Sequence, residues 1–113
     1  TAEAFTKSLK AKDIIGETIN IGSNFEVSIK EIIEMVSIIT NRKIEIKSDT
    51  KRIRPRSSEV ERLICSNKKA KKLLKWSPNY KGKTGFFRAL EKTVDWFSKK
   101  ENIKFYKSKI YNV

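Results

Sequence analysis

Hydrophobic residues recur every three or four positions in several stretches of the chain, and this spacing predicts amphipathic helices. The clearest helix begins after Ser28, which forms the S-x-x-E capping-box pattern with Glu31. Val27 and Ile32 stand at the positions of a hydrophobic staple, and Asn41 is a suitable residue to end the helix. Its apolar face is expected to contain Ile29, Ile32, Ile33, Val36 and Ile39.

Two shorter stretches carry the same period. Residues 2–9 place Phe5 and Leu9 four positions apart, on one face of a short helix. Asn67 can cap a second short helix that runs through Leu74 with its lysines facing outward. The inner face of this second helix would be formed by Ala70, Leu73 and Leu74.

A long helix is expected near the end of the chain. Residues 77–80 have the composition of a turn, and Thr84 is a suitable cap for the helix that follows. Its buried stripe would consist of Phe86, Phe87, Leu90, Val94 and Phe97, with Trp96 alongside. The tail, residues 102–113, is basic and aromatic and shows no clear period.

Three short segments are predicted to form β-strands. Residues 43–47 alternate strictly between polar and apolar, and residues 18–21 are rich in β-formers and are followed by a turn at residues 22–24. Residues 63–65 can form a third strand, whereas residues 49–61 show no period and predict a loop. The order of elements therefore predicts a small mixed α/β domain of the α+β kind, with a small sheet.

Composition narrows the classes of function. The chain has 113 residues, 38% of them hydrophobic and 35% charged, which is typical of one soluble globular domain. It has no histidine, so catalysis by histidine-dependent triads is excluded. It has a single cysteine and no apolar run of the roughly 20 residues that a membrane span needs. With no recognisable signal peptide, we expect a cytoplasmic protein and no membrane partner.

The net charge of +13 favours anionic partners, and two explanations stay open. In one, the lysines are an ordinary solvated surface, since 20 of the 26 basic residues are lysine. In the other, the chain is a basic module that binds nucleic acid or an acidic partner through residues 68–75 and the tail. Base stacking would then use Phe105, Tyr106 or Tyr111. The lysine bias makes nucleic acid the less favoured partner.

The arginines are concentrated in one place, because four of the six lie within residues 49–62. Guanidinium groups bind phosphates through two parallel hydrogen bonds, and Pro55 stiffens the backbone between Arg54 and Arg56. Glu59 could accept hydrogen bonds from a ribose diol. These residue types favour a nucleotide-diphosphate site, although a surface network of the arginines with Glu59 and Glu61 would use the same residues.

A family resemblance begins at this segment. The motifs are Arg54-Pro55, Ser58-Glu59-Val60, Cys65-Ser66-Asn67-Lys68-Lys69-Ala70 and Leu73-Leu74-Lys75-Trp76-Ser77-Pro78. Upstream stand Gly16-Glu17-Thr18-Ile19-Asn20-Ile21-Gly22-Ser23 and Glu26-Val27-Ser28-Ile29-Lys30-Glu31, and downstream the helix that ends near Phe97. In order and spacing the chain resembles the C-terminal region of NAD-dependent nucleotide-sugar 4,6-dehydratases and epimerases, which are extended short-chain dehydrogenases/reductases. Dehydratases acting on GDP-mannose or UDP-N-acetylhexosamines are the most similar.

The resemblance implies a binding role. It implies that Arg54 binds the diphosphate, with Arg56 as a second contact, and that Glu59 binds the nucleotide ribose of a UDP-, GDP- or dTDP-linked sugar. It also implies that residues 1–98 form a small substrate-binding domain and residues 99–113 a basic tail. Lys75 stands where the family has glycine, a position that favours a left-handed backbone.

The catalytic part of that family is not found in this chain. In the family, a Rossmann domain binds NAD(P) through a glycine-rich loop and carries a Tyr-x-x-x-Lys helix, and neither pattern occurs here. We therefore expect a fragment that contributes substrate binding and no catalysis by itself. A surface that packs against the absent Rossmann domain would be exposed and partly apolar, so self-association or marginal stability is expected.

Overall fold

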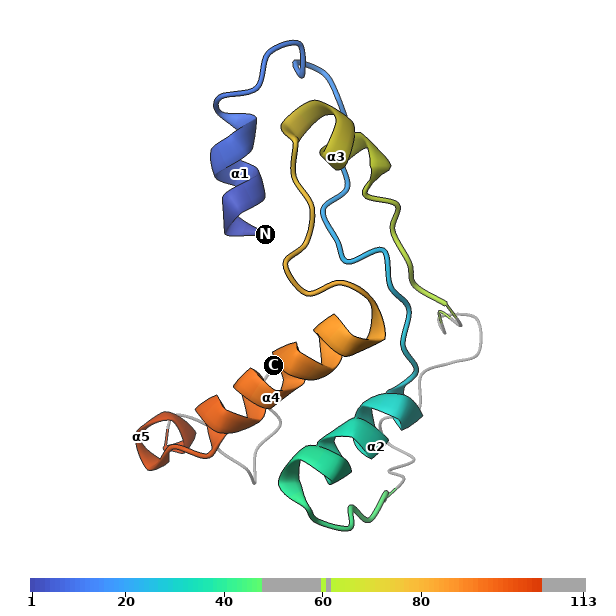
Figure 1. Ribbon diagram of the computed structural model, residues 1–113, viewed down its shortest axis with the longest axis vertical. Coiled ribbons are helices and arrows are strands. Elements are labelled where there is room, and N and C mark those ends of the chain that lie inside the picture. Colours follow the sequence, from blue (N-terminus) through green and yellow to red (C-terminus); the bar gives the residue numbers. More distant parts are fainter. Residues whose placement is uncertain (48–59, 61, 105–113) are drawn as a thin grey trace.

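The computed structural model describes residues 1–47, 60 and 62–104, and this part of the chain contains five helices (Figure 1). They are α1 (Ala2–Ser8), α2 (Ile29–Thr40), α3 (Lys68–Leu74), α4 (Gly82–Phe97) and α5 (Lys100–Ile103). Helix α1 packs against α3, and α2 packs against α4, which continues into α5. The two helix pairs lie at opposite ends of the molecule and are joined by extended segments (Figure 1).

The predicted mixed α/β fold is wrong for the described residues, because the regular elements they form are all helices and none is a strand. Residues 18–21, 43–47 and 63–65, expected as strands, form no backbone ladder. Residues 22–26 and 62–67 do lie side by side in antiparallel directions, since Asn67 Nδ2 donates to Gly22 O at 3.0 Å and Arg62 pairs with Glu26. A strand requires hydrogen bonds to a neighbouring strand, and alternation within one segment cannot supply that neighbour.

Helix α2 begins as its sequence predicted. Ser28 Oγ accepts a hydrogen bond from the Glu31 N–H at 3.2 Å, and Glu31 Oε2 accepts one from the Ser28 N–H at 2.9 Å. This reciprocal capping box satisfies backbone donors that have no partner within the helix. Asn41 ends the helix in a left-handed conformation with φ 50°, also as expected.

The predicted apolar face of α2 is largely confirmed, since Ile32, Ile33, Val36 and Ile39 are half-buried. Ile29, placed on the same face, is 73% exposed, and Met35, which was not expected there, is the buried residue of the helix. Just before the helix, the Phe25 ring lies 5.9 Å from the Phe86 ring of α4, measured between centroids. The period of the sequence predicted the helix and most of its buried side, and the deep burial of Met35 was not predicted.

The other helix pair encloses a small core. Its buried members are Ala4 of α1, Ala70 and Leu74 of α3, and Trp76. Ala11, Ile14, Ile19 and Ile21 pack against this core from the segment between α1 and α2. The predicted helix at residues 2–9 is confirmed, but the apolar face expected for it is wrong, since Phe5 is 69% and Leu9 is 87% exposed.

Two predicted caps differ from the structure. Asn67 is the N-cap residue of α3, but its side chain reaches Gly22 and makes no cap hydrogen bond. Helix α4 begins at Gly82 with Lys81 as its N-cap residue, so the expected cap at Thr84 is wrong. The Gly85 N–H donates to Lys81 O at 3.0 Å, and Gly85 lies directly against the Tyr80 backbone. The first turn of α4 therefore begins before Thr84.

The boundary expected between a domain at residues 1–98 and a tail at residues 99–113 falls between the end of α4 and the start of α5. Residues 105–113 lie outside the described part. Of the helices described, none has both the length and the apolar character to cross a membrane.

Lys75, which ends α3, has φ 50° and ψ 35°, a left-handed conformation that disfavours any residue with a Cβ atom. Lys75→Gly should raise the free energy of unfolding by about 1 kcal/mol, as measured by urea denaturation. Lys75→Ala removes the same charge and keeps the Cβ, so it should give no comparable gain. Equal stabilisation by both variants would contradict the backbone explanation.

Gly85 should resist substitution although it lies inside a helix, where alanine is normally preferred. A Cβ added there would lie 2.5 Å from the Tyr80 carbonyl carbon. Gly85→Ala should therefore lower the free energy of unfolding by about 1–3 kcal/mol, the usual cost of overpacking. Glu91→Ala, on an exposed position of the same helix, serves as the control and should change stability by less than about 0.5 kcal/mol.

Candidate functional site

The three residues predicted to bind substrate, Arg54, Arg56 and Glu59, lie outside the described part of the chain. The structure does describe where this arginine-rich segment ends. Val60 and Arg62 lie beside the start of α2, opposite residues 26–28. The candidate site is therefore built around Arg62 and the surfaces that it contacts.

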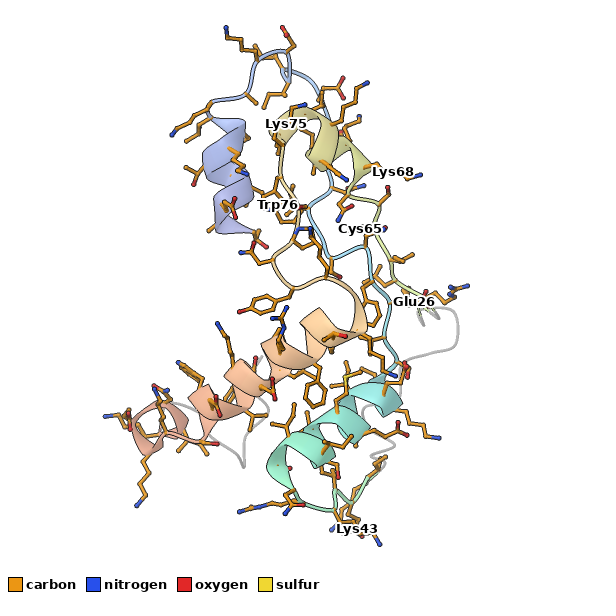
Figure 2. The ribbon with its side chains drawn as sticks, in the orientation of Figure 1. Glu26, Lys43, Cys65, Lys68, Lys75 and Trp76 are labelled. Carbon is orange, nitrogen blue, oxygen red and sulfur yellow. The ribbon has the colours of Figure 1, made fainter. Side chains whose placement is uncertain are left out.

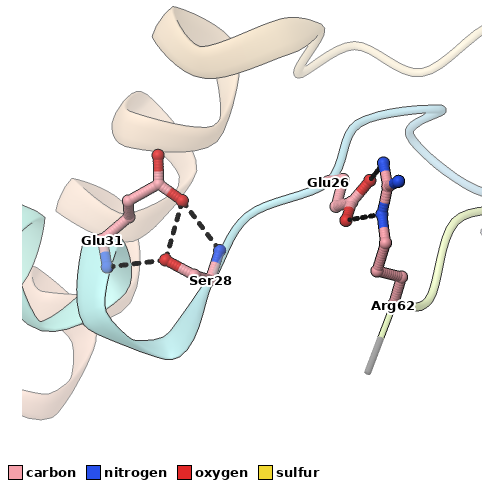
Figure 3. A network of polar contacts seen from close by, with 4 residues as sticks. All are labelled: Glu26, Ser28, Glu31 and Arg62. Carbon is pink, nitrogen blue, oxygen red and sulfur yellow. Dashed lines mark hydrogen bonds and ion pairs between the residues drawn. The ribbon is translucent and has the colours of Figure 1, made fainter. Parts of the chain in front are cut away.

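Arg62 is held by a carboxylate from a distant part of the sequence (Figure 3). Its Nε donates to Glu26 Oε1 and its Nη2 donates to Glu26 Oε2, each at 2.7 Å. Two parallel hydrogen bonds fix both the position and the plane of the guanidinium group. The arginine cluster was expected to bind phosphate or to pair with Glu59 and Glu61. For Arg62 the structure shows Glu26 as a partner, and Glu59 and Glu61 lie outside the described residues.

A cavity of about 650 Å³ opens next to this ion pair. It is lined by Glu26, Val27, Ser28, Ile29, Glu31, Val60, Arg62 and Leu63. The wall from α2 carries the capping box, and the opposite wall carries the exposed apolar side chains of Val60 and Leu63. Cavities of about 300–1,000 Å³ hold small-molecule ligands, so this one has room for a nucleotide or a sugar.

Glu26 and Arg62 pair with each other in this cavity, and Glu31 bonds to Ser28. The hydrogen bond from Arg62 lowers the pKa of Glu26, and the bond to Glu26 raises the pKa of Arg62. The Ser28 backbone N–H lowers the pKa of Glu31, helped by the Ser28 hydroxyl (Figure 3). A general acid at neutral pH needs a raised pKa, so these two carboxylates are suited to binding and structure and not to proton donation. Within the described ranges, no group of three acidic or cysteine side chains could hold a metal ion.

The basic surface considered as the alternative site lies on α3. Lys68, Lys71 and Lys72 are exposed, while Lys69 Nζ donates to Glu17 Oε2 at 2.7 Å and lowers the pKa of that carboxyl. Figure 2 shows Lys68 and Lys75 at the two ends of α3. The aromatic residues proposed to stack on bases, Phe105, Tyr106 and Tyr111, lie outside the described residues.

Sequence reasoning missed Glu26 as a partner of Arg62. The two residues are 36 positions apart, and no local pattern links them. Glu26 lies within one of the motifs that carry the family resemblance, but that motif assigned it no role. Comparison with protein-family models, with curated proteins and with solved structures finds no match to this chain.

The ion pair gives stability a dependence on acid pH. Because the pKa of Glu26 lies below its ordinary value of 4.5 in the folded chain, the unfolded chain binds more protons in acid. The contribution of the pair is complete at neutral pH and is lost as the pH falls below about 4.5. Glu26→Gln should make the decline of the free energy of unfolding below that pH shallower, as measured by urea denaturation at a series of pH values.

Arg62→Gln provides the matched test. In a chain that already lacks the Arg62 guanidinium, Glu26→Gln should have little further effect on the pH dependence. An unchanged acid decline in Glu26→Gln, or a full effect of that substitution without Arg62, would show that the pair does not govern this titration.

Proposed function

We propose that this chain binds the nucleotide-diphosphate part of a nucleotide sugar and contributes that binding, without catalysing a reaction itself, to an enzyme of the 4,6-dehydratase or epimerase type. One observation carries the proposal. The Glu26–Arg62 pair anchors the end of the arginine-rich segment at the rim of a cavity of about 650 Å³. The arginine-rich segment therefore ends, at Arg62, beside a space of ligand size.

Each part of the ligand has a proposed partner. Arg54 binds the diphosphate, with Arg56 as a second contact, because guanidinium groups match phosphate oxygens in geometry and keep their charge. Glu59 accepts hydrogen bonds from the two ribose hydroxyls. Arg62 is a positioning residue, since two of its five N–H donors bind Glu26 and fix the plane of the guanidinium group.

The cofactor of the resembling family does not fit the residues of this chain. NAD(P) binds at a glycine-rich loop between a strand and a helix, and the four glycines here, at positions 16, 22, 82 and 85, do not form that pattern. The proposal therefore contains no redox step. A dinucleotide-binding domain outside these residues would have to provide it.

Isothermal titration calorimetry with UDP-, GDP- and dTDP-linked sugars tests the proposal. At least one of these ligands should bind, and Arg54→Ala or Glu59→Ala should weaken its binding about tenfold or more, since each removes hydrogen bonds to the ligand. Arg42→Ala removes the same charge from an exposed position at the far end of α2 and should leave affinity unchanged.

Two results would contradict this function. In one, affinity would be the same in Arg54→Ala, Glu59→Ala and the native chain. In the other, a single-stranded oligonucleotide would bind more tightly than any nucleotide sugar and lose affinity steeply with salt. The second result would favour the basic surface of α3 as the functional one.

A further inference from the structure

Two large aliphatic side chains project into solvent from the connection that follows α1. Leu9 is 87% exposed and Ile15 is 101% exposed. Ile15 lies within a tight turn, in which the Glu17 N–H donates to Ile14 O at 3.0 Å and Gly16 takes a left-handed φ of 80°. Isoleucine is among the residue types most often buried, and turns favour small or polar residues.

This turn is held in place on both sides of Ile15. Ile14 packs against the core formed by α1, α3 and Trp76. Glu17 Oε2 accepts a hydrogen bond from Lys69 Nζ of α3 at 2.7 Å. The connection crosses from α1 towards α3 and forms one end of the long axis of the molecule (Figure 1). The aliphatic side chains therefore stand on a convex, anchored end of the fold and not in a groove.

The same end of the molecule is strongly basic. Residues 7–17 and 68–75 together contain eight lysines, no arginine and two acidic residues, Asp13 and Glu17. Glu17 is paired with Lys69, so its charge is already balanced. The exposed lysines here include Lys10, Lys12, Lys71, Lys72 and Lys75, and Figure 2 shows Lys75 at this end of α3. Exposed aliphatic side chains and a surplus of positive charge are thus combined at one end.

From this combination we propose that residues 9–17, together with the last turn of α3, bind the surface of an anionic lipid bilayer. Leu9 and Ile15 enter the boundary between headgroups and acyl chains, and the lysines attract the negative headgroups. A flat bilayer surface can reach side chains on a convex end, whereas a peptide strand or helix is usually bound in a groove or at a sheet edge.

Other anionic or apolar partners match this end less well. A nucleic acid would attract the lysines but would leave Leu9 and Ile15 in water, because bases stack on aromatic rings. A second copy of this chain is opposed by repulsion, since each chain carries a net charge of +13. The expectation of no membrane partner rested on the lack of a span and of a signal peptide, and a surface contact requires neither. This proposal is independent of nucleotide-sugar binding.

Co-sedimentation of the full chain with lipid vesicles tests the proposal. The chain should bind phosphatidylcholine vesicles that contain about one third phosphatidylserine, and should bind pure phosphatidylcholine vesicles about tenfold more weakly or worse. Leu9→Ser with Ile15→Ser should weaken binding to the anionic vesicles about tenfold or more, although every charge is kept. Ile38→Ser, which changes a 69% exposed side chain of α2 at the opposite end of the molecule, should leave binding unchanged.

The contribution of charge is tested in the same assay. Lys10→Gln with Lys12→Gln should weaken binding, whereas Lys30→Gln with Lys43→Gln, which removes the same charge from two exposed positions at or next to α2, should weaken it less. Because all of these side chains are exposed, urea denaturation should show that the variants keep the stability of the native chain.

Several results would overturn the proposal. The anionic vesicles could fail to bind, or the Leu9 and Ile15 double variant could bind them as tightly as the native chain. A loss in Ile38→Ser equal to that in the double variant would show that the effect does not belong to this end. Tighter binding of a single-stranded oligonucleotide that displaces the vesicles would assign the lysines to nucleic acid. Dimers found by sedimentation, and lost in the double variant, would assign Leu9 and Ile15 to a second copy.

Discussion

Burial of Trp76 is the interaction on which the α1–α3 end of the molecule depends. The residue is 5% exposed and lies in a cluster with Ala4, Ala70 and Leu74, so one side chain joins two helices. To reach this position the chain must reverse directly after α3, which places Lys75 in a left-handed conformation. The backbone cost is about 1 kcal/mol, whereas burial of a large aromatic side chain contributes more than this. After this reversal, the Lys75 carbonyl oxygen accepts a hydrogen bond from Lys7 Nζ of α1 at 3.0 Å. This bond adds a second link between the helices.

Features set by neighbours in the sequence were predictable, and features set by distant residues were not. The capping box of α2 depends on two residues three positions apart, so the local sequence alone predicts it. The deep burial of Met35 in α2 was not predicted, and a strand depends on a partner strand. For that reason the alternation of residues 43–47 predicted the wrong element. The start of α4 was missed because the helix begins at Gly82, before Thr84, and its first turn is closed by the hydrogen bond from the Gly85 N–H to Lys81 O.

The candidate site shows the same division. The concentration of arginine before residue 62 was visible in the sequence, and so was the chemistry of a phosphate contact. The position of Arg62 could not be read in the same way, because it is fixed by Glu26 across 36 residues. Exposed ion pairs contribute little to stability, yet a pair with two parallel hydrogen bonds can still set geometry. The role of Glu26–Arg62 is therefore to hold the end of the segment in place beside the cavity.

Leu63 lines the cavity, and at 84% exposure it leaves that wall open to water. Arginine–phosphate attraction is weak in water and grows as the local dielectric constant falls. In the proposed function, a nucleotide sugar bound in the cavity would cover the Leu63 wall and exclude water from it, so its diphosphate would contact the arginines in a drier site.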